Sequence, residues 1–329
     1  MAVLVTGGAG YIGSHMVLKL LDEGEAVVVV DDLSKGFDWA VPDAAELVVG
    51  DIADQALVEE TIRRRGVDAI IHFAGSIVVP DSVSDPLGYY LNNTVKSRSL
   101  IESAVRAGVP HFIFSSTAAV YGSAEHIPVG EDAPTLPESP YGTSKLMTEL
   151  MLRDAAAAHP LTYTALRYFN VAGADPARRT GQSTAGATHL IKVAAETATG
   201  KRSHLEVYGT DYPTPDGTCI RDYIHVSDLA AAHHLALKRL RAGGDSLVAN
   251  CGYGRGYSVR EVIDAVRRVC GVDFEVRYAA RRPGDAVAIV ANSDRARAEF
   301  GWTPALDDLD KIVGHALAWE EVLRGRNAR

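Results

Sequence analysis

The sequence contains few cysteines. Only three occur in 329 residues, Cys219, Cys251 and Cys270, and no two of them have the CxxC spacing of a zinc-binding or redox pair. A disulfide framework and a zinc site are therefore both unexpected, and we expect no bound metal.

Long apolar runs and an excess of positive charge are also missing. Apolar runs such as AVVVV at 26–30 are far too short to span a bilayer. AVLVTG directly follows Met1 and predicts a strand there, so we expect no secretion signal. The net charge of −9 argues against broad binding to nucleic acid or anionic membranes, because both need a basic face. We therefore expect a cytoplasmic enzyme or binding protein with no nucleic-acid or membrane partner.

The first half of the chain does contain a regular alternation of strand and helix patterns. β-Branched and apolar runs predict strands at 2–6, 26–31, 46–50, 69–73, 111–116 and 161–168, several of them apolar throughout, as in buried parallel strands. Helical patterns lie between them near 11–23, 54–65, 87–107 and 141–157. This order predicts an α/β fold with a doubly wound parallel sheet of the Rossmann type.

The second half is less regular. Loops rich in glycine, proline and threonine separate predicted helices near 187–199, 226–241, 258–270 and 308–323. We expect a Rossmann domain at 1–171 and a smaller, less regular α/β substrate domain at 172–329, an arrangement that allows the chain to cross between the two.

A glycine loop, GGAGYIG at 7–13, joins the first predicted strand to the first helix. Gly7, Gly10 and Gly13 have the GxxGxxG spacing, and Gly8 also completes a GxGxxG pattern. Glycines permit a tight turn and a close approach of backbone amides to a pyrophosphate, and the helix N-terminus favours negative charge. A glycine turn without a ligand is the alternative.

An acidic pair, Asp31-Asp32, ends the second predicted strand, near the spacing at which an acid binds the adenosine ribose. No arginine follows directly to receive a 2′-phosphate, and Lys35 is the one nearby cation. The pattern therefore predicts NAD rather than NADP.

Tyr141 and Lys145 stand four positions apart in SPYGTSK at 139–145, which stacks them on one helix face. A tyrosine that acts as a base near neutrality needs its pKa lowered by about 3 units. A lysine about 5 Å away contributes roughly 3 kcal/mol of the energy required. Together with the positive ring of oxidised nicotinamide, the pair indicates a base that removes a hydroxyl proton. A surface pair without function is the alternative.

Five motifs occur in order along the chain: TGGAGYIG, HFAG, FSSTAAVYG, SPYGTSK and RYFNVAG. Together they resemble the extended short-chain dehydrogenase/reductase superfamily. Two further segments, YGTDYPTPDGTCIRDYIHVSDLA at 208–230 and RRPGD at 281–285, narrow the resemblance to the UDP-glucose 4-epimerases, also called UDP-galactose 4-epimerases. The similarity spans nearly the whole chain. It implies an isomerase that interconverts UDP-glucose and UDP-galactose with NAD, through a transient 4-keto sugar.

The resemblance also implies roles for individual residues. Tyr141 would be the base, Lys145 would hold the nicotinamide ribose, and Thr117 would bind the sugar 4-hydroxyl. Cofactor contacts would come from Gly7, Gly10, Tyr11, Ile12, Gly13, Asp31, Asp32, Asp51, Ile52, Phe73, Ala74, Gly75, Asn92 and Phe169, in addition to Tyr141 and Lys145. UDP-sugar contacts would come from Thr117, Asn170, His189, Leu190, Tyr208, Arg221, Arg282, Asp285 and Ile289.

Four positions depart from the family pattern. Thr117 stands where serine is commoner, and it keeps the hydroxyl. Ile77 stands where many epimerases have a lysine, and His189-Leu190 replaces an asparagine-leucine pair. Ile289 stands where a tyrosine restricts larger sugars, so we expect a wider sugar pocket. The resemblance also implies a homodimer, in which the helices predicted at 87–107 and 141–157 pair across a two-fold axis.

Other functions are compatible with parts of the sequence. Within the superfamily, a UDP-N-acetylglucosamine or UDP-pentose 4-epimerase remains an alternative. A 4,6-dehydratase or decarboxylase is disfavoured, because Ala118 and Ala119 occupy the positions of its acidic residues. A non-catalytic NAD-binding sensor would not need Tyr141 and Lys145. The histidines His225, His233 and His234 lack a second ligand set and are expected to be structural.

Overall fold

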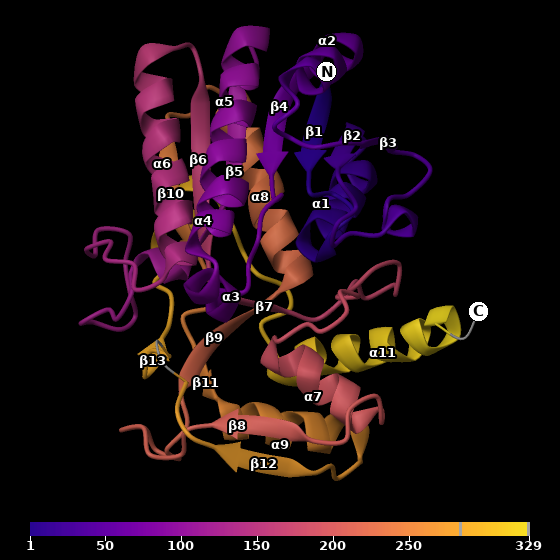
Figure 1. Ribbon diagram of the computed structural model, residues 1–329, viewed down its shortest axis with the longest axis vertical. Coiled ribbons are helices and arrows are strands. Elements are labelled where there is room, and N and C mark those ends of the chain that lie inside the picture. The colour runs from indigo at the N-terminus through magenta and orange to yellow at the C-terminus, as the bar shows by residue number, and fades with distance from the viewer. Residues whose placement is uncertain (283–284, 328–329) are drawn as a thin grey trace.

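The computed structural model describes residues 1–282 and 285–327 (Figure 1). Its larger part is a seven-stranded sheet with the order β10-β6-β5-β4-β1-β2-β3, and all neighbouring strands are parallel. The strands are β1 (Ala2–Thr6), β2 (Ala26–Asp31), β3 (Glu46–Val49), β4 (Val67–His72), β5 (His111–Thr117), β6 (Thr162–Tyr168) and β10 (Leu247–Cys251). This is the strand order of a doubly wound Rossmann sheet with one added edge strand, so the predicted fold class is confirmed.

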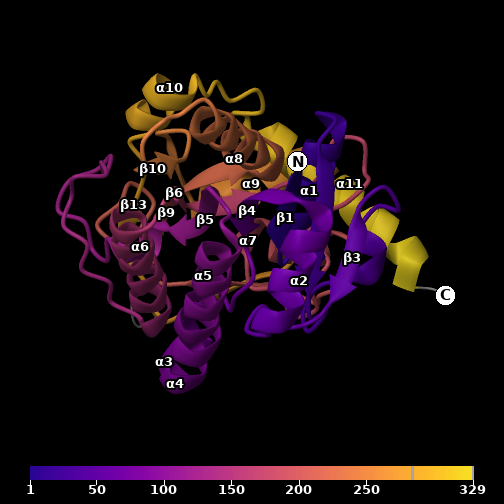
Figure 2. The ribbon, with the colours of Figure 1, turned by 90° about the horizontal axis from the view of Figure 1, so that it is seen from above.

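Helices cover both faces of this sheet (Figure 2). One face carries α1 (Tyr11–Asp22) and α8 (Val226–Arg241), and the other carries α2 (Gln55–Arg65), α5 (Lys96–Ala107) and α6 (Pro140–Ala158). Successive residues of β1 point to opposite faces: Val3 joins the same core cluster as Met16, whereas Leu4 joins that of Ile62 and Leu152. Burial on both faces explains why the strands read as continuous apolar runs.

The helix predicted at 87–107 is divided in the structure. It consists of α4 (Pro86–Tyr89), a π-helical turn η2 (Tyr90–Val95) and α5, and a further short helix, α3 (Val79–Ser84), precedes it. The Asp85 carboxylate accepts a hydrogen bond from the Gly88 amide at 3.0 Å and so begins α4 separately from α3. π-Helical turns are often found at functional sites.

The second part is smaller and is drawn below the sheet in Figure 1. Strand β9 (Ile220–His225) pairs with β7 (Asn170–Ala172), β11 (Gly256–Ser258) and β13 (Ala288–Ile289), while β8 (Leu205–Tyr208) pairs with β12 (Val276–Ala279). The helices are α7 (Leu190–Ala198), α9 (Val259–Cys270), α10 (Asp294–Phe300) and α11 (Leu309–Asn327), and short 3₁₀ turns occur at η1 (Asp38–Ala40) and η3 (Ala118–Val120). Within the described residues, no helix combines the length and apolar character needed to cross a membrane.

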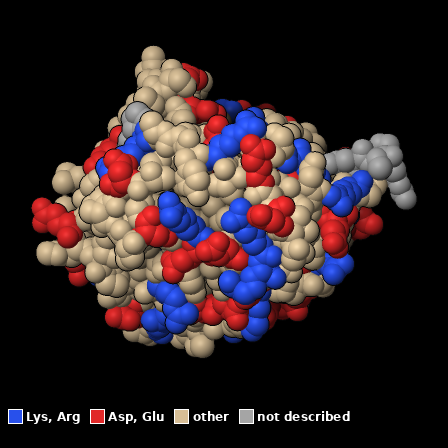
Figure 3. Space-filling model, turned by 90° about the horizontal axis from the view of Figure 1, so that it is seen from below, with Lys and Arg blue, Asp and Glu red and all other residues tan. Residues whose placement is uncertain are grey.

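The chain crosses between the two parts at the carboxyl ends of the sheet strands. β6 is followed after one residue, Phe169, by β7, and β9 runs directly into α8, which returns to the sheet. Side chains at the carboxyl edge of the sheet therefore lie close to the second part. Basic and acidic groups are interspersed on the underside of the molecule (Figure 3).

Candidate active site

The loop between β1 and α1 is shaped by close backbone packing. Gly7 has a left-handed backbone (φ 70°), and a Cβ on Gly13 would overlap the carbonyl oxygen of Gly7. Gly10 begins α1 without a side chain to cap it. The amides of the first helical turn therefore remain available to an anion, and the geometry suits a pyrophosphate.

Carboxylates lie at the ends of the next two strands. Asp31 is buried, and its oxygens accept hydrogen bonds from the amides of Ala9 and Leu33, each at 2.9 Å. Burial raises the pKa of Asp31. Asp51 forms an ion pair of 2.7 Å with Lys96, a residue that the sequence did not single out. The other cofactor candidates follow strands in the same way: Asp32 after β2, Ile52 after β3, Phe73, Ala74 and Gly75 after β4, and Phe169 after β6.

The turn η2 brings two asparagines to this edge. Asn92 Nδ2 donates to Ser76 Oγ at 2.9 Å. Asn93 binds the Ser76 backbone through both side-chain atoms, at 2.7 and 2.9 Å, and donates to Ser144 Oγ at 3.1 Å. Asn93 thus ties the loop after β4 to α6. Sequence reasoning identified only Asn92, because adjacency alone does not tell which residue faces inward. Ile77, in the same loop, is exposed.

Helix α6 positions Tyr141 and Lys145. Ser139 caps its N-terminus, accepting a hydrogen bond from the Gly142 amide at 3.2 Å, so Tyr141 lies in the first turn. Both side chains are buried, with 8% and 3% exposure. Lys145 Nζ donates to the Ser115 carbonyl at 3.0 Å. The helix therefore holds the pair against the end of β5.

Burial dominates the electrostatics of this pair in the chain by itself. Burial raises the pKa of Tyr141 to about 12, and the Thr117 hydroxyl offsets part of that rise. Burial lowers the pKa of Lys145 to about 8. Desolvation therefore dominates the pKa of Tyr141 in the chain by itself, and the lowering expected beside bound NAD stays a prediction.

Thr117 ends β5 beside these two residues. It is buried, and its hydroxyl oxygen accepts a hydrogen bond from the Ala119 amide at 3.1 Å. Glu149, a buried acid on α6, is bound by Arg167 Nη2 at 2.6 Å and Nε at 2.9 Å. Its carboxylate is thus committed to an ion pair, and Ala118 and Ala119 supply no proton donor.

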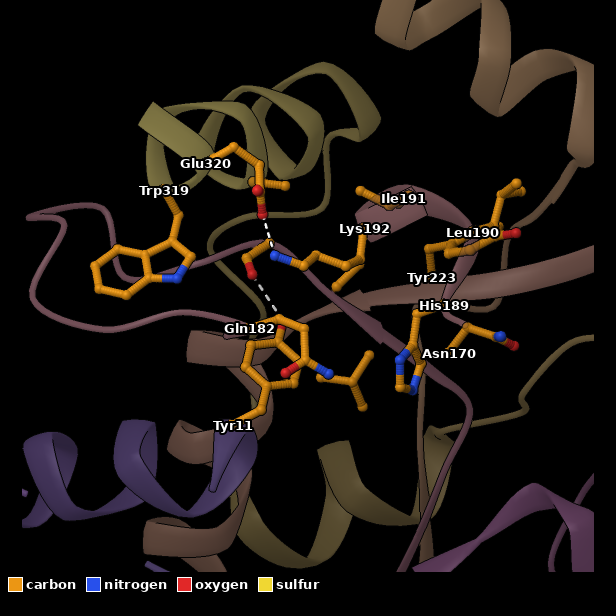
Figure 4. Close-up of a pocket in the computed structure, with 14 residues that line it drawn as sticks. Tyr11, Asn170, Gln182, His189, Leu190, Ile191, Lys192, Tyr223, Trp319 and Glu320 are labelled. Carbon is orange, nitrogen blue, oxygen red and sulfur yellow. Dashed lines mark hydrogen bonds and ion pairs between the residues drawn. The ribbon is translucent and has the colours of Figure 1, made fainter. Parts of the chain in front are cut away.

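A small cavity of about 20 Å³ lies where α1, β7, α7 and α11 meet (Figure 4). Its lining includes Tyr11 from the cofactor loop and three substrate candidates, Asn170, His189 and Leu190. The Tyr11 hydroxyl donates to the Gly173 carbonyl at 2.7 Å. Within the described residues, His189 Nδ1 is buried without a hydrogen-bond partner, and burial lowers the pKa of this histidine. A neutral imidazole is thus available to a ligand.

Four further substrate candidates converge near β8 and β9. The Arg282 guanidinium lies 4.5 Å from the centre of the Tyr208 ring, and its Nε donates to Asp285 at 3.0 Å. Arg221 Nη2 lies 3.8 Å from the same carboxylate. Two arginines around one acid can be redirected to a diphosphate by charge-assisted hydrogen bonds. Residues 283 and 284 of the RRPGD motif lie outside the described residues.

Ile289 connects this cluster to the end of β5. It pairs in register with Arg221 across β13 and β9. Its side chain is buried in an apolar cluster that includes Ala118 and is contacted by Phe169. The structure therefore places Ile289 between the arginine cluster and the segment that carries Thr117.

Two of the three histidines predicted to be structural, His225 and His233, have hydrogen-bond partners, and the third, His234, is buried. His225 Nδ1 accepts a hydrogen bond from the Ser227 amide at 3.0 Å, and its Nε2 lies 2.9 Å from His315 Nδ1. His233 Nδ1 bonds the Leu229 carbonyl at 2.8 Å. In residues 1–282 and 285–327, no group of three or more His, Cys, Asp or Glu side chains could hold a metal ion.

Comparison with known proteins identifies close relatives over the full length. The UDP-glucose 4-epimerase of Azospirillum brasilense is 60% identical over 321 residues, which cover 98% of this chain and 92% of the relative. The structure of the Brucella ovis UDP-glucose 4-epimerase in complex with NAD is 45% identical, covers 96% of this chain and 97% of that chain, and superposes with a TM-score of 0.94. The structure of the Bifidobacterium longum enzyme with NAD⁺ and UDP is 38% identical, covers 98% of both chains and has a TM-score of 0.92.

A family model also matches most of the chain. It describes the NAD dependent epimerase/dehydratase family and covers residues 3–252. That range contains the glycine loop, the Tyr141–Lys145 pair and β9 with Arg221. From this match and the full-length relatives, the chain belongs to the NAD dependent epimerase/dehydratase family.

Proposed function

We propose that this chain is an isomerase that interconverts UDP-glucose and UDP-galactose, by NAD-dependent epimerisation at carbon 4 of the sugar. The observation that carries the proposal is the buried Tyr141–Lys145 pair, which α6 holds at the same sheet edge as the glycine loop at 7–13. The full-length similarity to UDP-glucose 4-epimerases supports the same activity.

The cofactor is held by the carboxyl edge of the sheet. Amides of the glycine loop would bind its pyrophosphate, Asp31 would bind the adenosine ribose, and Lys145 would bind the nicotinamide ribose. When bound, NAD would supply reversible hydride transfer at carbon 4 of the sugar, which allows the hydride to return to the opposite face of the ring. This redox-neutral cycle lets the protein keep its cofactor between turnovers.

Tyr141 moves the proton. Its phenolate oxygen takes the proton of the 4-hydroxyl as the hydride leaves carbon 4, and these two losses together give a 4-keto sugar. When the hydride returns to carbon 4, Tyr141 gives the proton back to the ketone oxygen. Thr117 holds that oxygen in place. Because burial, partly offset by the Thr117 hydroxyl, raises the Tyr141 pKa to about 12, base function depends on positive charge near the phenol.

The nucleotide end of the substrate is anchored while the sugar turns over. Arg221 and Arg282 bind the diphosphate, Tyr208 lies near the uracil, and Asp285 orients the two guanidinium groups. Asn170, His189 and Leu190 complete the site from the cavity side. Charge-assisted bonds to the diphosphate hold the substrate without fixing the sugar ring.

Incubation of the purified protein with UDP-galactose, with and without added NAD, tests this function. Separation of the products should show UDP-glucose in both reactions. A 4-keto-6-deoxy product would identify a dehydratase instead. No conversion by protein that carries NAD would contradict the proposal.

The proposed domains are residues 1–171, which would bind the cofactor, and residues 172–329, which would bind the nucleotide sugar. Within the second range, α8 and β10 return to the main sheet. The cytoplasmic location stays a prediction that cell fractionation would test.

A homodimer is part of the same proposal. An apolar strip runs along α3, α4 and η2 at four-residue intervals, formed by Val83, Leu87, Leu91 and Val95, whose exposure is 50% or more. Met147 and Leu150 on α6 are each 40% exposed. Such a strip is typical of an interaction surface, and a two-fold dimer with a second copy would cover it. Light scattering should report twice the chain mass, and a monomer at working concentration would contradict this.

A further inference from the structure

Five charged side chains form a network behind the cavity of Figure 4. Lys192 on α7 and Glu320 on α11 form an ion pair, and their side chains are only 7% and 1% exposed. Glu320 also accepts a hydrogen bond from Lys201 Nζ at 2.6 Å. Lys192 Nζ lies 3.3 Å from Glu196, which in turn accepts from Arg202 Nε at 2.5 Å. The network joins α11 to both ends of α7.

This network constrains the backbone on both sides of His189. Arg202 Nη2 donates to the carbonyl of Ala187, two residues before His189, at 2.9 Å. On the other side, His189 begins α7, and its carbonyl accepts a hydrogen bond from the Val193 amide at 2.9 Å. Lys192 lies within that first turn. The network therefore couples the position of His189 to α11. None of its five side chains is among the predicted UDP-sugar contacts.

The His189 ring has no other fixed role. It does not cap α7, and its Nδ1 is buried without a partner in the described part of the chain. Figure 4 shows Glu320 directed toward Lys192, with His189 and Asn170 lining the same cavity. A ring held by its backbone, and not by its own hydrogen bonds, keeps its polar atom free for a ligand.

A buried ion pair is weak evidence for stability, because apolar residues of similar size often pack as well or better. Its directional contacts, however, hold two helices at one relative position. A role in placing the start of α7 explains why α11 directs a buried carboxylate at this point.

We propose that Glu320 is a positioning residue for the nucleotide sugar: through Lys192 it holds the first turn of α7 and thereby places His189 and Leu190 beside Asn170. The inference rests on the proposed function, which assigns these three residues to the UDP-sugar. It adds α11, a helix without any predicted role, to the determinants of substrate affinity.

The test variant is Glu320→Gln, which keeps the side-chain shape and removes the charge. The KM for UDP-galactose should rise about tenfold, while kcat should stay within about twofold of wild type. This pattern is expected when binding of the substrate and of the transition state is weakened equally. The Kd for UDP, measured by calorimetry, should rise by a similar factor. The NAD content should be unchanged, because no hydrogen bond or ion pair of the network reaches the loop at 7–13 in the described part of the chain.

A second test variant and a matched control complete the experiment. Arg202→Gln removes the partly exposed end of the network and releases Ala187, so it should raise KM and the UDP Kd even if Glu320→Gln fails to fold. Glu321→Gln, an exposed neighbour on α11, is the matched control and should behave as wild type. Unchanged KM and UDP affinity in folded Arg202→Gln, or a fall in kcat alone, would overturn the inference. A wild type without epimerase activity would defeat the proposed function instead.

Discussion

The α-carbon of Gly7 lies so close to the backbone after β4 that a Cβ on it would be 2.6 Å from the amide nitrogen of Ala74. The glycine loop and the loop after β4 are therefore packed backbone to backbone. Both loops carry predicted cofactor residues. Any side chain at Gly7 must separate them or distort the turn.

Gly7→Ala should therefore lose most of its bound NAD and destabilise the fold. A left-handed alanine costs about 1–2 kcal/mol by itself, and the overlap with Ala74 adds to that cost. Absorbance at 260 and 280 nm measures the retained nucleotide, and thermal unfolding measures stability.

Gly24→Ala is the matched control. Gly24 also has a left-handed backbone, at φ 80°, but a Cβ there would meet no atom within 4 Å. This variant should show the conformational cost alone and keep its NAD. Equal NAD retention and equal stability loss in the two variants would show that the approach to Ala74 is unimportant.

Tyr141→Phe tests the proton transfer. The variant keeps the buried ring but removes the hydroxyl, so kcat should fall by about 10²- to 10⁴-fold, the usual cost of losing a general base. NAD content and melting temperature should stay close to wild type. Tyr278→Phe, which removes the hydroxyl of an exposed tyrosine on β12, should leave kcat unchanged. A Tyr141→Phe rate near wild type would mean that another group is the base.

Four buried histidines make stability depend on pH. Burial lowers the pKa to about 4 for His15 and His233 and to about 3 for His72 and His225. A histidine in the unfolded chain titrates near pH 6.5, so below that pH the unfolded state binds more protons than the folded state. The stability that these four neutral histidines contribute to the folded state is fully present above pH 6.5 and is lost as the pH falls toward 3–4.

Urea unfolding at pH 7.5 and pH 5 measures this effect. The free energy of unfolding should decrease at pH 5 by about 1–2 kcal/mol for each of these histidines. Asp222 acts in the opposite direction, because burial raises its pKa to about 6. His233→Leu should reduce the difference between the two pH values, whereas a change at the exposed His126 to asparagine should not. An unchanged difference in His233→Leu would refute the assignment to this histidine.

Local sequence patterns were sufficient to predict most strands of the sheet. They could not predict which distant segments pack together. The run at 26–31 was predicted as a strand and is β2, because its apolar and β-branched residues are buried within a single short element. The position of β10 was not predicted, because the sequence indicated only a short strand or two between the helices of the second half. β10 pairs with β6, so that Leu247 lies opposite Thr164, a contact between segments far apart in the sequence.

In the candidate active site, too, local motifs could be predicted from the sequence and long-range contacts could not. The glycine loop and the Tyr141–Lys145 spacing are local motifs and could be recognised from sequence. The Lys192–Glu320 pair links residues on two separate helices, and no local pattern announces it. The burial that raises the pKa of Tyr141 in the chain by itself could not be predicted from the sequence, because it depends on the whole tertiary structure.

Ile289 bears on the range of accepted sugars. It is 9% exposed, lies opposite Arg221 in the β13–β9 pair and shares an apolar cluster with Ala118. A tyrosine at this position restricts larger sugars in the family that the sequence resembles. The shorter isoleucine leaves more room, so we expect UDP-N-acetylglucosamine to be converted more slowly than UDP-glucose, but measurably.

Ile289→Tyr should make the protein more selective. The larger ring cannot fit within the apolar cluster without strain, so it should occupy space near the sugar and reject the acetamido group. A difference of one or two carbon atoms is worth about 1–3 kcal/mol, so the ratio of kcat/KM for the N-acetylated sugar to that for UDP-glucose should fall about tenfold or more. Val287→Tyr, at a 38% exposed position two residues earlier, is the control and should leave the ratio unchanged. The melting temperature of each variant separates a specific loss from general destabilisation. An unchanged ratio in folded Ile289→Tyr, or no N-acetyl activity in the wild type, would show that Ile289 does not set the size of the sugar pocket.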